Sequence, residues 1–157
     1  MSGMLKAGLI GLVVGGIFGL GITLVIAYCT PCAAIVIGLG VGFLACLWDK
    51  PATGGSGAGL GAKAGAIAGV GHLGGQLLGM LANGLLVGPE GAAEFLDQLG
   101  LDATTMEPAA YWVSQIVING GCGITNIAIA AGLGALGGLL WFQTIGKNQT
   151  PQQQPTF

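Results

Sequence analysis

Charged side chains are scarce in this chain, and arginine is missing altogether. Only 6% of the 157 residues are charged, against about a quarter in an ordinary soluble domain. Four lysines and six acids cannot cover the surface of a soluble fold of this size. The net charge of -2 also provides no basic surface for nucleic acid. The composition therefore excludes an ordinary soluble domain and gives no reason to expect a nucleic-acid partner.

Apolar residues and glycine make up most of what is present. The chain is 53% hydrophobic and has 33 glycines, which lie inside apolar runs without the three-residue period of collagen. Apolar runs of about 20 residues are typical of transmembrane helices. Glycine within such runs favours close helix packing in lipid. We therefore expect an all-α integral membrane protein in contact with membrane lipid.

Four apolar runs predict four spans in a single transmembrane domain. The apolar run after Lys6 is longer than the core of a cleavable signal peptide, so we expect it to be retained as the first span. A Gly/Ser/Pro-rich link is expected from Asp49 to Ala62. The domain covers residues 1–147, a polar tail covers 148–157, and the spans run over about 5–28, 33–48, 63–87 and 110–142.

The segment from Pro89 to Glu107 holds five of the six acids. Within it, apolar residues recur at helical spacing, while Glu90, Glu94 and Asp97 fall on the other face. This pattern predicts a short amphipathic helix lying on the membrane surface.

Lysine placement predicts the orientation of the chain. With four spans, all the lysines lie on one side of the membrane, namely Lys6, Lys50, Lys63 and Lys147. The acidic segment then lies on the other side. The positive-inside rule then places both termini in the cytoplasm. The amphipathic helix is accordingly expected to be extracytoplasmic.

Glycines spaced four residues apart occur in every predicted span. Residues four apart share one helix face, so each series forms a smooth groove against which another backbone can pack. We therefore predict a four-helix glycine-zipper bundle, and some grooves would serve other membrane subunits or further copies of the chain. The predicted packing positions are Gly11, Gly15, Gly19, Gly38, Gly42, Gly57, Gly61, Gly65, Gly69, Gly134 and Gly138.

Cys29-Thr30-Pro31-Cys32 is a candidate redox or disulfide pair, placed between the first two spans. This layout resembles the DsbB family of quinone-coupled membrane oxidoreductases, which have four spans and a CxxC pair after the first. The resemblance implies thiol–disulfide chemistry at Cys29 and Cys32. Two features of that family have no counterpart here, because Gly88 to Ala109 contains no cysteine and the chain has no arginine to hold a quinone. A structural disulfide or two inert thiols is the alternative.

The only histidine, His72, lies inside the third predicted span. Its small neighbours suggest room for a macrocycle, which makes it a candidate axial ligand for haem or chlorophyll. The alternative is a neutral imidazole hydrogen-bonded across the bundle. Cys46 and Cys122 are too far from the CxxC pair to complete a zinc site, so no metal site is predicted.

Amide side chains form a polar stripe on the third and fourth spans. Buried amides need hydrogen-bond partners, so we expect the stripe to face protein rather than lipid. Its members are Gln76, Asn83, Gln115, Asn119 and Asn126.

The whole layout resembles the small glycine-rich four-span membrane proteins of prokaryotes that carry a CxxC at the first hairpin. That resemblance implies a location in the prokaryotic cell inner membrane and no particular activity. No catalytic residues stand out, so the leading hypothesis is a non-enzymatic accessory or scaffold subunit. The alternatives are a thiol–disulfide or cofactor-binding redox component, using haem, chlorophyll or quinone, and a small oligomeric pore.

Overall fold

The computed structural model describes residues 1–25, 31–100 and 107–149, and these residues form helices without any strand. Four of the helices are long and apolar enough to cross a membrane, which confirms the predicted all-helical, multi-pass membrane protein. In chain order the elements are α1 (Gly3–Val25), α2 (Pro31–Asp49), α3 (Gly54–Leu86), α4 (Gly88–Gln98), α5 (Pro108–Trp141), the π-helical turn η1 (Phe142–Gly146) and α6 (Lys147–Gln149).

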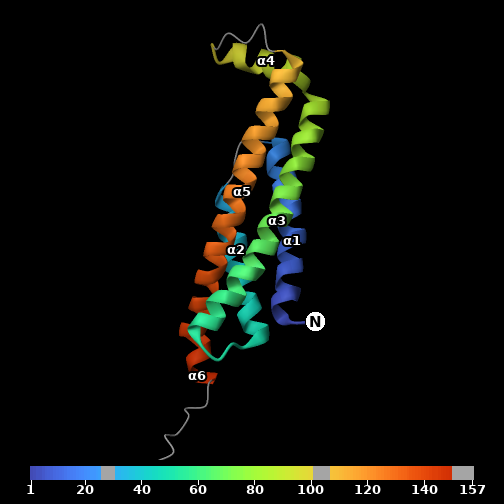
Figure 1. The fold of residues 1–157 in the computed structure, drawn as a ribbon. Helices are drawn as coiled ribbons and strands as arrows, with labels where there is room; N and C mark the ends of the chain where they lie inside the picture. The colour runs from blue at the N-terminus through green and yellow to red at the C-terminus, as the bar shows by residue number, and fades with distance from the viewer. Residues whose placement is uncertain (26–30, 101–106, 150–157) are drawn as a thin grey trace, which may run out of the picture.

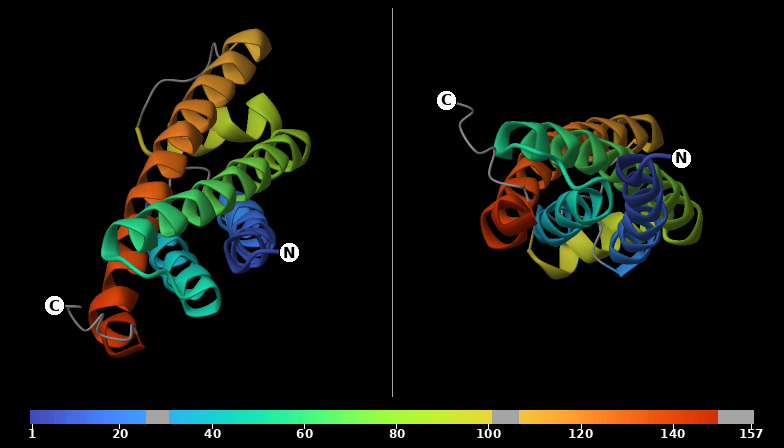
Figure 2. Two further views of the ribbon diagram at one scale, coloured as in Figure 1. Left: turned by 60° about the horizontal axis from the view of Figure 1, so that its bottom comes forward. Right: turned by 90° about the horizontal axis from the view of Figure 1, so that it is seen from below.

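Successive long helices run in opposite directions (Figure 1). Helix α3 packs against each of the other three long helices, while α1 and α2 lie together on one side of the α3–α5 pair (Figure 2). The α3–α5 pair is also longer than α1 and α2, and its upper part extends beyond them (Figure 1). Helix α3 is therefore the centre of the bundle.

The two ends of the bundle differ in charge. The start of α1, the α2–α3 link and α6 lie at one end, and α4 lies across the other (Figure 1). The four lysines are exposed towards the first end, and the exposed acids Glu90, Glu94 and Asp97 belong to α4. The helix that the acidic segment predicted is therefore present, and the lysines and the acids of α4 are separated along the bundle axis.

The start of the third span differs from the sequence prediction. Helix α3 begins at Gly54 instead of about Lys63, so the predicted Gly/Ser/Pro-rich link is wrong over most of its length. A capping box starts the helix: the backbone N–H of Ser56 donates to Thr53 Oγ1 at 3.2 Å, and that of Thr53 donates to Ser56 Oγ at 3.3 Å. The predicted end of the first span, near Tyr28, lies outside the described residues.

Contact with α5 explains why so glycine-rich a segment is helical. Gly57, in the second turn of α3, lies against the backbone of Gly138 on α5, and Gly61 lies against that of Gly134. This close packing offsets the low helix propensity of glycine. Hydropathy and composition alone do not include such contacts, so they predict a link for this segment.

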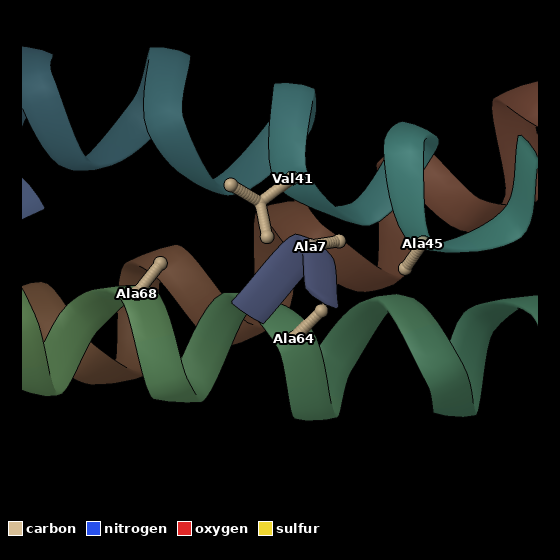
Figure 3. Packing of buried hydrophobic residues seen from close by; sticks show 5 residues of the cluster. All are labelled: Ala7, Val41, Ala45, Ala64 and Ala68. Carbon is tan, nitrogen blue, oxygen red and sulfur yellow. The ribbon is translucent and has the colours of Figure 1, made fainter. Parts of the chain in front are cut away.

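The core of the bundle is made of very small side chains. Its main cluster joins α1, α2 and α3 through one valine and four alanines, shown in Figure 3: Ala7, Val41, Ala45, Ala64 and Ala68. Side chains of this size let the helix backbones approach one another closely.

Glycines on α1 and α2 lie directly against neighbouring backbones. A Cβ atom at Gly15 on α1 would stand 2.7 Å from the carbonyl oxygen of Ala68 on α3. A Cβ at Gly38 on α2 would stand 2.7 Å from the carbonyl oxygen of Ala130 on α5. Real side chains do not approach backbone atoms so closely, so only glycine fits at these positions without a shift of a helix.

The other predicted packing glycines also lie at helix–helix contacts. Among them, Gly65 meets the backbone of Ala130 from the α3 side, and Gly69 meets that of Ile127. By contrast, Gly59 and Gly74 on α3 are exposed, and no atom lies within 4 Å of a Cβ built there. The remaining positions in contact are Gly11, Gly19, Gly42, Gly57, Gly61, Gly134 and Gly138.

Asp49 closes the lysine-bearing end of the bundle. The backbone N–H groups of Gly3 and Met4 donate to its two carboxylate oxygens, each at 2.6 Å. The first N–H groups of a helix have no partner within the helix, and a carboxylate there also interacts favourably with the helix dipole. The last residue of α2 therefore caps the first turn of α1.

Replacing this carboxylate should weaken the α1–α2 pairing. We expect Asp49→Ala to lower the free energy of unfolding by about 1–2 kcal/mol, the usual range for a lost helix cap. SDS titration of the protein in mixed micelles, followed by circular dichroism, measures this change. Glu94→Ala, at an exposed position on α4, is the control and should have little effect; equal effects of the two would contradict the capping role.

A matched pair of alanine substitutions on α3 tests the close helix contacts. Gly65→Ala places a Cβ against the Ala130 carbonyl, so we expect a loss of about 1–3 kcal/mol in the same titration. Gly59→Ala meets no neighbour and should be neutral or stabilising by up to about 1 kcal/mol, because alanine is the better helix former. Similar responses at both positions would show that α3 and α5 do not need to touch.

Candidate functional site

Four large polar side chains are buried in a bundle whose interior is made mostly of glycine and alanine. His72 and Gln76 come from α3, Asn119 and Asn126 come from α5, and each is at most 2% exposed. The two other members of the amide stripe, Asn83 and Gln115, are partly buried. Because buried polar groups in an apolar environment need a reason to be there, these residues form the candidate site.

Backbone contacts place three of these residues in one section of the bundle. Gly15 of α1 packs against the backbone of His72, and the side-chain oxygen of Gln76 lies 3.4 Å from a Cβ built at Gly123 on α5. Asn126 is one helical turn further along α5 from Gly123, next to the residue that contacts Gly69. His72, Gln76 and Asn126 therefore lie within neighbouring turns of one section of the bundle, where α1, α3 and α5 all contribute.

Hydrogen bonds within this cluster are few. His72 Nδ1 lies 3.3 Å from the carbonyl oxygen of Gly15. A carbonyl oxygen only accepts, so this contact is a hydrogen bond when Nδ1 carries the proton, and in the neutral ring Nε2 then keeps its lone pair. Asn119 donates from Nδ2 to the backbone oxygen of Gln115 at 2.9 Å and to its side-chain oxygen at 3.0 Å.

The neighbourhood of His72 is filled by other helices. Gly71 and Gly75 lie against the backbone of α1 at Leu12 and Gly16, and Gly69 lies against α5. Gly74 is the neighbour that faces outward. The small residues around His72 thus serve helix contacts, and the room for a macrocycle that they suggested in the sequence is taken up by α1 and α5.

The cysteines are spread along the bundle. Cys29 lies outside the described residues, and Cys32 is exposed in the first turn of α2. Cys46 is buried, and its thiol donates to the carbonyl oxygen of Gly57 at 3.3 Å, which ties α2 to α3. No disulfide joins Cys32, Cys46 and Cys122 to one another, and the described part of the chain brings no three His, Cys, Asp or Glu residues together as a metal site.

Two contacts at the lysine-bearing end were missed by the sequence analysis. The Asp49 cap joins residues 46 positions apart, and the Cys46–Gly57 bond crosses a segment that was expected to be a link. A lone acid at the end of an apolar run, followed by Lys50 and Pro51, is the one signal that could have indicated a cap.

These features define the chain as a multi-pass helical membrane protein with a polar cluster inside its bundle. No protein-family model, curated protein or solved structure matches it.

Proposed function

We propose that the chain is a non-enzymatic accessory or scaffold component that packs against further transmembrane helices in a membrane complex. One observation carries this proposal: α5 has a second, outward row of small residues, flanked by the exposed side chains of Ile124 and Leu136. Gly121, Thr125, Ala128 and Gly132 recur at helical spacing, and all four are exposed. The inward face of α5, on the opposite side of the helix, is already used by α2 and α3.

This face of α5 is poorly suited to contact with lipid alone. Elsewhere the bundle exposes large aliphatic side chains, such as Ile17 on α1, Val36 on α2 and Leu78 on α3. A Cβ built at Gly121 or Gly132 meets no atom within 4 Å. Each glycine weakens a helix by about 1 kcal/mol relative to alanine, and close contact with another helix would offset this loss.

The simplest occupant is a second copy of the chain. Two identical α5 faces brought together by a twofold axis are complementary to themselves, and small residues on both sides allow the backbones to touch. A helix of another subunit would need a similar small-residue face. The thiol–disulfide, cofactor-binding and pore alternatives have no comparable support among the described residues.

The orientation belongs to the same proposal. We place the lysine-bearing end in the cytoplasm of a prokaryotic cell, with the chain in its inner membrane, and α4 on the extracytoplasmic surface. The separation of exposed lysines from the acids of α4 supports this assignment through the positive-inside rule. The glycine contacts between helices support a glycine-zipper mode of packing.

Cysteine cross-linking tests the outward face of α5. The four native cysteines are first replaced, and Thr125→Cys is then oxidised in native membranes. We expect a disulfide-linked dimer, whereas the control Ile17→Cys on the exposed side of α1 should give little. A cross-link from Thr125→Cys to a different protein would indicate the larger complex. If both positions cross-link equally weakly and the purified protein is a monomer by mass, the proposal is wrong.

Labelling with a membrane-impermeant maleimide tests the orientation in the same cysteine-free background. Glu94→Cys should react in intact cells, whereas Ser2→Cys and Ser56→Cys should react only after the membrane is made permeable. Labelling of Ser2→Cys and Ser56→Cys from opposite sides would contradict the first hairpin, and a fully reversed pattern would contradict the cytoplasmic assignment.

A further inference from the structure

Unpaired polar atoms are concentrated in one section of the bundle. Six buried side-chain nitrogen or oxygen atoms have no hydrogen-bond partner among the described residues. Five of them belong to three side chains: His72 Nε2, both amide atoms of Gln76 and both amide atoms of Asn126. The sixth, Trp141 Nε1, is at the far end of α5.

Asn119 shows that the bundle can satisfy a buried amide when a partner is at hand. It lies on the same helix as Asn126 and is as deeply buried, and it donates twice to Gln115, four residues earlier. The residue four positions before Asn126 is Cys122, whose side chain is a much weaker partner. Asn126 therefore lacks the side-chain partner that Asn119 has on the same helix, and both of its amide atoms have no partner among the described residues.

Small residues of α1 and α2 adjoin this section of the bundle. Gly38 of α2 packs against Ala130 of α5, and Gly42 packs against Gly134, so the two helices run in the same direction. Ala34 lies one turn before Gly38, and Asn126 lies one turn before Ala130. Ala34 is therefore the residue of α2 that lies beside Asn126. On the α1 side, Gly15 adjoins His72.

A ligand that satisfies these unpaired atoms must both donate and accept hydrogen bonds. With Nδ1 bonded to Gly15, the neutral His72 ring offers an acceptor at Nε2. Each amide offers one acceptor oxygen and one donor nitrogen, whichever way it is turned. A cation would satisfy the acceptors and leave both amide nitrogens unpaired, and an anion would do the reverse.

Charge also argues for a neutral guest. The acids of α4 are exposed at one end of the bundle, and Asp49 caps α1 at the other. No charged residue of the described helices faces His72, Gln76 or Asn126, so an ion there would have no counter-charge. Water is the small neutral molecule that matches such a set of donors and acceptors.

We propose that His72, Gln76 and Asn126 form an internal water-binding site at the middle of the bundle. At least two water molecules are needed, because His72 Nε2 and the two amide oxygens accept three hydrogen bonds and each water donates two; the waters accept in turn from the amide nitrogens. Towards the lysine-bearing end the site is closed by the backbone contacts of Gly65 with Ala130 and of Gly61 with Gly134. The site does not depend on whether the outer face of α5 binds a second copy.

Nuclear magnetic resonance of the whole chain in lipid nanodiscs tests this site directly. His72 is the only histidine, so ¹⁵N-histidine labelling gives ring signals from this residue alone. We expect magnetisation transfer from water to the ring of His72 in the unmodified protein. Asn126→Leu, which removes one anchor at nearly constant volume, should abolish or strongly reduce this transfer. Asn119→Leu is the matched control and should retain it.

Each outcome decides the proposal. Absence of transfer from water to His72 in the unmodified protein overturns it, and a direct contact between the side-chain amides of Gln76 and Asn126 would show that the two residues pair with each other instead. Transfer that is unchanged in Asn126→Leu also overturns the assigned site. If Asn126→Leu does not fold, as judged by circular dichroism and size, Asn126→Ser replaces it, and the unmodified protein still decides whether water is present.

Discussion

Direct contact between helix backbones is the constraint on which the rest of this structure depends. Lipid gives apolar helices no hydrophobic gain from touching one another, so association depends on close packing and on hydrogen bonds between helices. Helix α3 meets this requirement with glycines against α1 and α5, and α2 does so against α5. Large aliphatic side chains are accordingly found on the outside, and the core cluster contains nothing larger than valine.

The same constraint gives the buried polar residues their importance. Where backbones touch, a polar side chain must find its partner within the bundle, because neither lipid nor bulk solvent can supply one. Asn119 finds Gln115, and His72 finds the carbonyl of Gly15, which α1 can offer because Gly15 has no side chain to hold the helices apart. Close packing and polar contact thus depend on the same glycine positions.

Hydropathy and charge predicted four spans and a separate acidic helix, because both reflect the solvent around each segment. The prediction from hydropathy and charge was wrong at the start of α3. There, contacts of Gly57 and Gly61 with α5 stabilise a helix in a segment whose composition predicts a link. The candidate site was predictable as a set of residues, since a histidine and amides stand out among apolar neighbours. Their partners were not, because Gly15 and Asp49 act through a backbone carbonyl and a cap that depend on which helices become neighbours.

The unequal helix lengths give the molecule no single hydrophobic thickness. Helices α3 and α5, with 33 and 34 residues, are each about 50 Å long, whereas the hydrocarbon core of a bilayer is about 30 Å thick. With 23 and 19 residues, α1 and α2 come close to matching that core. Helices α3 and α5 must therefore tilt or extend beyond the hydrocarbon core, as the exposed Lys63 ten residues inside α3 indicates for one end. The lipid around α3 and α5 therefore differs in its contacts from the lipid around α1 and α2, and the molecule presents two unlike sides to the membrane.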